Sequence, residues 1–309
     1  MPRKNTQSES KPRQDQPQPA AKAAPSKVRT RRILMATGVF VGAAGLWAWI
    51  TLCLFFRQTS WQLLYHPSHK ITETPANAGL AFNPVGFAAT DTGAPQLRGW
   101  WIPAASGAPL SRYTVLYLHG RNGDLSDTVP ALAAIHAAGV NLLAFDYRGY
   151  GQSEYARPTE AHWREDAQAA LGYLTGMRHI ASRAIVLDGA GLGANLALEV
   201  AAAHPELAGV VLDEPLASPL KAVFSDPRAQ LVPARLLVRD RYRLKVPATK
   251  LRIPSLWLLA AQPSAHAPGP IAQAYAAATA PRKLVQLTAA PAQQDSTQAL
   301  ATWLNSLSR

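Results

Sequence analysis

DGAGLGAN, residues 188–195, is the stretch that decides the fold of this chain. It follows the apolar run AIVL and precedes the apolar segment LALEV, so it predicts a buried strand, a glycine-rich turn and a helix. Two kinds of site use such a turn. One is a GxGxx[GA] loop that binds phosphate groups. The other is a GxSxG turn that presents a serine nucleophile, with Gly191 standing in place of the serine.

From Arg57 onward the chain alternates short apolar runs with longer amphipathic stretches. The candidate strands are 85–90, 97–103, 113–119, 140–146, 184–188, 209–213, 255–260 and 283–288. The candidate helices are 128–138, 160–176, 192–203, 271–279 and 295–307. Strands separated by helix-length segments require crossover connections. The sequence therefore predicts an α/β fold with a mostly parallel, eight-stranded sheet and helices on both faces.

The N-terminal part of the chain differs from the rest. Residues 1–32 hold few large apolar side chains and predict a disordered, basic, cytoplasmic tail. Residues 33–56 run 24 positions without a charge, about 36 Å as a helix against a hydrocarbon core of ~30 Å. The run is too long for the apolar core of a cleaved signal peptide. The alternative, a buried core helix of a soluble domain, is disfavoured because the run has no polar face. It predicts one transmembrane helix in contact with membrane lipid.

Charge supports a membrane topology rather than nucleic-acid binding. The tail carries nine basic and two acidic residues, a net +7 of the chain's +12. Basic flanks stay cytoplasmic, so we expect an inner (cell) membrane protein whose residues 57–309 face the periplasm or the outside. The single cysteine, Cys53, excludes an intrachain disulfide or cysteine zinc site. Gly38 and Gly42 form a GxxxG pair, one route to a homodimer.

Several motifs follow one another in residues 57–309. They are QLLYHPSHKITETPANAGL (62–80), FAATDTGAPQLRGWWIPA (87–104), YLHGRNGDLSD (117–127), DYRGYGQSE (146–154), the turn at 188–195 and HPELAGVVLDEP (204–215). In this order they resemble the alpha/beta-hydrolase superfamily, and within it the branch anchored by one N-terminal helix. The resemblance covers about residues 57–309 and implies an alpha/beta-hydrolase fold. Residues 215–253, rich in proline and arginine, are then a less regular insertion or cap.

In that superfamily a serine, histidine and acid triad transfers acyl groups, and two backbone amides form an oxyanion hole. The resemblance assigns those amides to Leu192 and Arg121. Backbone donors do not depend on side chains, so the hole can remain. The nucleophile position, however, carries Gly191, which has no oxygen.

The other two triad positions are also replaced. By the resemblance, Pro263 or its neighbour Ser264 stands where the acid belongs, and Gln293 stands where the histidine belongs. No carboxylate lies between Asp240 and Asp295. A triad needs a base near its nucleophile and an orienting group behind the base. The sequence therefore predicts a degenerate triad.

A glycine at position 191 has a physical advantage. Such a turn holds its central residue at positive φ, where a side chain costs about 1–3 kcal/mol and glycine costs almost nothing. Gly189 and Gly193 are expected to remain because helix and strand pack closely there. The competing dinucleotide interpretation uses Gly189, Gly191 and Ala194, with Asp213 as the ribose ligand. A serine-to-glycine change in any GxSxG turn creates most of that pattern, so it is the weaker alternative.

Other catalytic candidates lack the geometry of the turn. They are Ser153 and Ser264 as nucleophiles and His119, His162 and His266 as bases. We expect His119 to pack its loop, and Asp146 to pair with Arg148. His136 and His162 have no third ligand nearby in sequence, so no metal and no cofactor is expected.

The sequence thus predicts a membrane-anchored pseudo-hydrolase that binds a small ligand with an acyl or anionic group, or a protein partner. The alternative is an active, esterase-like hydrolase with a nonstandard catalytic set.

Overall fold

The structure is a computed structural model that describes residues 27–89, 94, 96–260, 269–287 and 292–307; of Lys27 and 292–294 it describes the backbone alone. The chain divides into two units, Met1–Thr51 and Leu52–Arg309. Helix α1, Lys27–Thr59, begins before the predicted boundary at residue 33, because no glycine or proline interrupts 27–33. Within the described ranges, one helix is long and apolar enough to cross a membrane. The rest of the predicted tail, 1–26, lies outside them.

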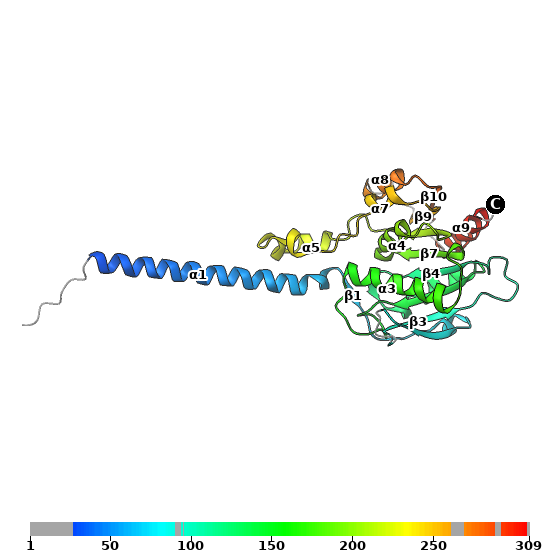
Figure 1. The fold of residues 1–309 in the computed structure, drawn as a ribbon, viewed down its shortest axis with the longest axis horizontal. Coiled ribbons are helices and arrows are strands. Elements are labelled where there is room, and N and C mark those ends of the chain that lie inside the picture. The colour runs from blue at the N-terminus through cyan, green and yellow to red at the C-terminus, as the bar shows by residue number, and fades with distance from the viewer. Residues whose placement is uncertain (1–26, 90–93, 95, 261–268, 288–291, 308–309) are drawn as a thin grey trace, which may run out of the picture. The chain divides into compact units, whose positions relative to one another are not determined.

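The second unit is built on one eight-stranded sheet with the order β10-β9-β8-β7-β4-β6-β3-β2 (Figure 1). The strands are β2 Asn83–Phe87, β3 Leu97–Ile102, β4 Thr114–Leu118, β6 Asn141–Asp146, β7 Ile185–Ala190, β8 Gly209–Asp213, β9 Ser255–Ala260 and β10 Arg282–Leu287. The pairs β2–β3 and β3–β6 are antiparallel, and the other pairs are parallel. The predicted mostly parallel, eight-stranded sheet is confirmed.

Helices cover both faces of this sheet, as predicted. One face packs against α3 Glu160–Gly172, α4 Leu192–Ala203, α7 Lys245–Lys250 and α8 Gly269–Ala277. The other packs against α2 Val129–His136 and α9 Ala292–Ser306. Successive strand residues point to opposite faces. In β4, for example, Leu116 and Leu118 join the first cluster while Val115 and Tyr117 join the second.

Shorter elements complete the unit. A separate parallel pair joins β1 His66–Pro67 to β5 Asn122–Gly123, which the sequence did not predict. The predicted helix 160–176 ends as α3 at Gly172 and continues as a π-helical turn, Tyr173–Met177. Single 3₁₀ turns occur at Ser60–Leu63 (η1), Pro75–Ala78 (η2), Leu125–Thr128 (η3) and Ser182–Ala184 (η5).

The segment 215–253 contains short helical pieces before α7: α5 Lys221–Ser225, η6 Pro227–Gln230 and α6 Ala234–Leu237. Reciprocal hydrogen bonds hold it against the N-terminus of α3. The Glu160 carboxylate accepts from the amides of Arg241 at 2.6 Å and Tyr242 at 2.7 Å. In return, Asp240 Oδ1 accepts from the Glu160 amide at 3.0 Å. Two side chains therefore fix an irregular segment to a regular helix.

Candidate functional site

The turn at 188–195 is a single residue long. Strand β7 ends at Ala190 and α4 begins at Leu192, with Gly191 between them at φ 56° and ψ −116°. A Cβ added to Gly191 meets no heavy atom within 4 Å, so space does not require a glycine there. A Cβ on Gly189 overlaps the backbone of Gly193. Close packing therefore requires glycine at 189, whereas backbone conformation alone favours it at 191.

The two amides assigned to an oxyanion hole follow the carboxyl ends of neighbouring strands, β7 and β4. Leu192 is the first residue of α4, so its amide has no carbonyl four residues earlier to bond within the helix. The Arg121 carbonyl accepts from the His66 amide and from the Tyr150 hydroxyl, both at 2.9 Å. These bonds fix the loop of Arg121. The joint role of the two amides stays a prediction.

The other two triad positions are only partly covered by the residues that the structure describes. Pro263, Ser264 and His266 lie outside the described residues. Gln293 falls in the first turn of α9, where the backbone is described. Degeneracy at these two positions therefore stays a prediction from the sequence.

A cavity of about 370 Å³ lies beside Gly191. It is bordered by the ends of β4, β7 and β8 and by α2 and α9. Its polar wall comes from three strands. Tyr117 of β4 is the register partner of Asp188 in β7, and Asp188 that of Val211 in β8. Asp213 follows Val211 by two residues, so its side chain leaves the same face of the sheet.

The carboxyl groups of this cavity have unusual acidity. Asp188 is 4% exposed, and none of the described residues is hydrogen-bonded to its carboxyl group. Burial, and then the charge of Asp213, raise the pKa of Asp188 well above its usual value. Burial, and then Glu214, raise the pKa of Asp213 to about 6. Burial therefore favours the protonated form of Asp188, beside the Asp213 carboxylate.

This acidic wall was not predicted from the sequence. The sequence carried a signal for it, because Asp188 interrupts an apolar strand and its neighbours in that strand are expected to be buried.

The acidic wall also bears on the ligand that the sequence predicts. Asp213 and Glu214 line the cavity, and their negative charges repel an anion. The ligand with an acyl or anionic group stays a prediction.

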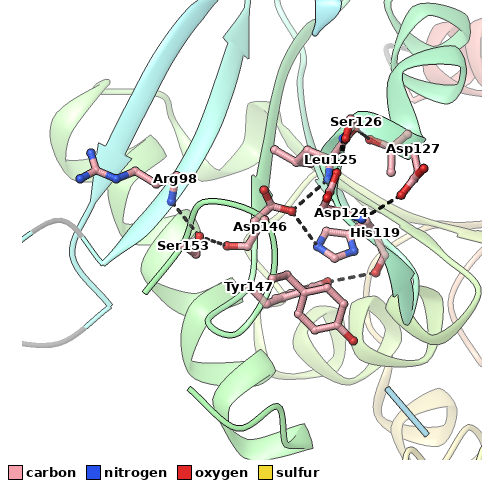
Figure 2. A network of polar contacts seen from close by, with 12 residues as sticks. Arg98, His119, Asp124, Leu125, Ser126, Asp127, Asp146, Tyr147 and Ser153 are labelled. Carbon is pink, nitrogen blue, oxygen red and sulfur yellow. Dashed lines mark hydrogen bonds and ion pairs between the residues drawn. The ribbon is translucent and has the colours of Figure 1, made fainter. Parts of the chain in front are cut away.

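His119 belongs to a separate buried network (Figure 2). Its Nδ1 lies 2.8 Å from the Gly120 carbonyl, and its Nε2 lies 3.7 Å from Asp146 Oδ1. Burial lowers the pKa of His119 to about 4, and burial, then Asp124, raise the pKa of Asp146 to about 8. Both groups are neutral at pH 7. The His119 ring packs on Tyr147 with centroids 4.5 Å apart, which agrees with a packing role for His119.

The expected pair of Asp146 and Arg148 is wrong. Strand β6 ends at Asp146, and the chain then turns so that Arg148 reaches α3. Its Nε lies 2.5 Å from Asp166 Oδ1 and its Nη2 lies 2.7 Å from Glu165. Asp146 instead accepts from the Leu125 amide at 3.0 Å.

Ser153 also has a structural role. Its hydroxyl donates to the Asp146 carbonyl at 2.5 Å and accepts from the Arg98 amide at 2.9 Å, as Figure 2 shows. His136 Nε2 and His162 Nδ1 each lie 2.9 Å from a backbone carbonyl oxygen. Among the described residues no group of three potential ligands could hold a metal ion.

Comparison with known proteins agrees with this fold. Residues 110–254 match the family model described as "Serine aminopeptidase, S33". The chain is 29% identical over 208 residues to the uncharacterized protein YfhR of Salmonella typhi, covering 62% of this chain and 67% of that protein. It is 33% identical over 122 residues to mouse alpha/beta hydrolase domain-containing protein 17C, covering 39% of this chain and 38% of that protein. A third or more of each relative is therefore unmatched.

Solved structures show the same architecture. The esterase Pf2001 of Pyrococcus furiosus aligns with 79% of this chain and 97% of its own, with a TM-score of 0.58 at 18% identity. At that identity the likeness concerns the fold. The strand order, the single-residue turn at Gly191, the family-model match and these relatives show that the chain belongs to the alpha/beta-hydrolase superfamily.

Proposed function

We propose that this protein is a membrane-anchored, non-catalytic member of the superfamily that binds a small ligand in the cavity beside Gly191. The observation that carries the proposal is the turn itself. Gly191 holds the backbone conformation φ 56°, ψ −116° at the junction of strand and helix, and it offers no nucleophilic atom. The fold is thus kept while the group that starts acyl transfer is missing.

The chemistry of the cavity limits the types of ligand that fit it. Its wall combines the Tyr117 hydroxyl, the Asp188 carboxyl group, whose pKa is raised, and the Asp213 carboxylate. The rest of the lining is largely apolar, including Val211, Leu258 and Leu300. Such a surface suits a small neutral or cationic molecule with an apolar body. A protein partner at the same face is the other binding role consistent with a lost triad.

An active-site fluorophosphonate probe tests the absence of a serine nucleophile. The purified protein is expected to remain unlabelled, while an active superfamily esterase treated in parallel is labelled. Ser153→Ala is the matched variant, because Ser153 is the candidate nucleophile from the sequence that lies among the described residues. Labelling of the native chain that heat denaturation abolishes would contradict the pseudoenzyme proposal.

A second candidate is hydrolysis by a nonstandard catalytic set. Raised pKa values of Asp188 and Asp213 within one cavity favour it, because catalytic acids and bases show such shifts. Turnover of p-nitrophenyl esters that disappears in Asp213→Asn but persists in Glu154→Gln would support this candidate.

Dinucleotide binding remains the minor alternative, since Asp213 and Gly191 line the same cavity. It predicts a thermal shift with millimolar NAD or NADP, and no shift would exclude it.

For the anchor, we propose that α1 spans the inner (cell) membrane with its N-terminus in the cytoplasm. The apolar run 33–56 and the net +7 charge of the residues before it support this orientation. Resistance to alkaline extraction tests the anchor. A reporter fused after Arg309 is expected to be located in the periplasm. A cytoplasmic location of this reporter would show that the orientation is reversed.

A further inference from the structure

A second cavity, of about 240 Å³, lies where the apolar helix ends. Three arginines from distant parts of the chain line it: Arg57 from the last turn of α1, Arg157 before α3, and Arg239 from the segment 215–253. Trp61, Leu64 and Val223 contribute apolar walls. All of these residues belong to the second unit.

The positive charge of this cavity is not balanced by its one lining carboxylate, Asp240. Both oxygens of Asp240 are already engaged. Oδ1 accepts from the Glu160 amide at 3.0 Å, and Oδ2 accepts from the Tyr65 hydroxyl at 3.1 Å. Within the described residues, the guanidinium groups of Arg57 and Arg239 have no hydrogen-bond or ion-pair partner.

Arg157 is positioned by the end of the apolar helix. Its Nη2 donates to the Arg57 carbonyl at 2.7 Å, and its Nη1 lies 3.4 Å from Gln58 Oε1. Its Nε is buried without a hydrogen-bond partner among the described residues. Burial lowers the pKa of Arg157, the Asp240 carboxylate opposes that shift, and the neighbouring Arg57 adds to it. Two neighbouring guanidinium groups repel each other, and a bound anion would offset this unfavourable electrostatic free energy.

The surrounding surface has the same character. The segment 215–253 carries nine basic and two acidic residues, a net +7, while the remainder of 57–309 carries 13 basic and 15 acidic residues, a net −2. The segment also exposes Leu231 at 63% and Leu236 at 81%. Its helix α5 packs on η1, which directly follows α1. Basic and exposed apolar side chains thus gather in the element that adjoins the end of the apolar helix.

We propose that the cavity formed by Arg57, Arg157 and Arg239 binds the phosphate of an anionic phospholipid in the membrane that α1 spans. The guanidinium group matches phosphate oxygens with two parallel hydrogen bonds. A free phosphate shares this chemistry. The position selects the lipid, because Arg57 is the first charge after the apolar run and so lies at the level of the headgroups, where tryptophans such as Trp61 are enriched. The proposal rests on the anchor of the proposed function and not on the Gly191 cavity.

The test is thermal unfolding of the full chain in neutral detergent micelles. The probes are dioctanoyl-phosphatidylglycerol, dioctanoyl-phosphatidylcholine and glycerol phosphate. We expect phosphatidylglycerol to raise Tm in a saturable way, because a ligand of the native state stabilises it. Phosphatidylcholine and glycerol phosphate should raise it little. Arg239→Gln should raise the apparent Kd for phosphatidylglycerol about tenfold, the usual size for the loss of one charge-assisted contact.

The controls separate the cavity from general charge effects. Arg183→Gln removes the same charge from an exposed site away from the cavity and should leave lipid binding unchanged. Arg157→Gln should also weaken binding, and Arg239→Gln covers the case in which Arg157→Gln unfolds. Three results would overturn the proposal: no stabilisation by phosphatidylglycerol, equal stabilisation by glycerol phosphate, or an unchanged response in Arg239→Gln. A failure of the proposed membrane anchor can be told apart from these results, because alkaline extraction would then release the protein from the membrane.

Discussion

The amide of Gly191 donates a 2.8 Å hydrogen bond to the carbonyl of Asp213. This bond ties the single-residue turn after β7 to the end of β8. As a consequence, the position without a nucleophile and a carboxylate of raised pKa border the same cavity. The site therefore combines a turn without a nucleophilic side chain and two carboxyl groups of raised pKa in a largely apolar cavity.

Gly191→Ser should fold but with reduced stability. The added Cβ has room, yet φ is positive, so we expect a loss of about 1–3 kcal/mol of unfolding free energy. Gly189→Ala should cost more, because its Cβ overlaps the backbone of Gly193. Gly172→Ala, in a helix with open space, is the control and should gain about 0.5–1 kcal/mol. Chemical denaturation measures all three, and a Gly191→Ser protein as stable as the native one would contradict the strain argument.

Asp188→Asn should stabilise the protein at neutral and alkaline pH. Because the folded-state pKa of Asp188 is raised, the native state binds a proton more tightly than the unfolded state, and stability falls as pH rises above about 4. The asparagine does not titrate and avoids this loss. We expect a gain in unfolding free energy that grows as the pH rises from neutral to alkaline. Glu154→Gln, at an exposed position, should change little; equal pH profiles for native and Asp188→Asn proteins would refute the assignment.

Asp146→Asn should flatten the pH dependence of stability between about pH 4 and pH 8, the window set by the raised pKa of Asp146. In the native protein, stability falls across this window as the buried carboxyl group is forced to ionise. The asparagine oxygen can still take the place of Oδ1 and accept from the Leu125 amide. Unfolding curves recorded at several pH values test this, and an unaltered slope would show that Asp146 titrates normally.

Asp166→Ala should be among the most destabilising changes in α3. The Asp166 carboxylate is fully buried and pairs with Arg148, whose side chain is 10% exposed. Its removal leaves the amide and Nε of Arg148 without their acceptor, with Glu165 as the remaining ion-pair partner. We expect a loss of about 3–5 kcal/mol. Glu199→Ala breaks the more exposed pair with Arg164 and should cost about 0–1 kcal/mol. Similar losses in the two variants, measured by urea unfolding, would exclude a special role for the buried pair.

The elements were predictable because their signals are local. Each of the eight candidate strands overlaps an observed strand, and β8 and β9 match to the residue. The helix α4 is also matched to the residue, since a glycine turn precedes it and its apolar pattern is regular. Predictions failed where partners lay far apart in sequence. Arg148 bonds to α3 rather than to Asp146, and the pair β1–β5 joins segments that no local pattern connects.

The sequence by itself determined the alternation of strands and helices, the apolar helix at the N-terminus and the absence of a side-chain oxygen at position 191. Those properties depend on residue type and on spacing along the chain. Only the tertiary structure decided that Tyr117, Asp188 and Asp213 share one cavity, and that Arg57, Arg157 and Arg239 share another. These groups come from separate elements, so their distances, burial and pKa values are set by how sheet and helices pack.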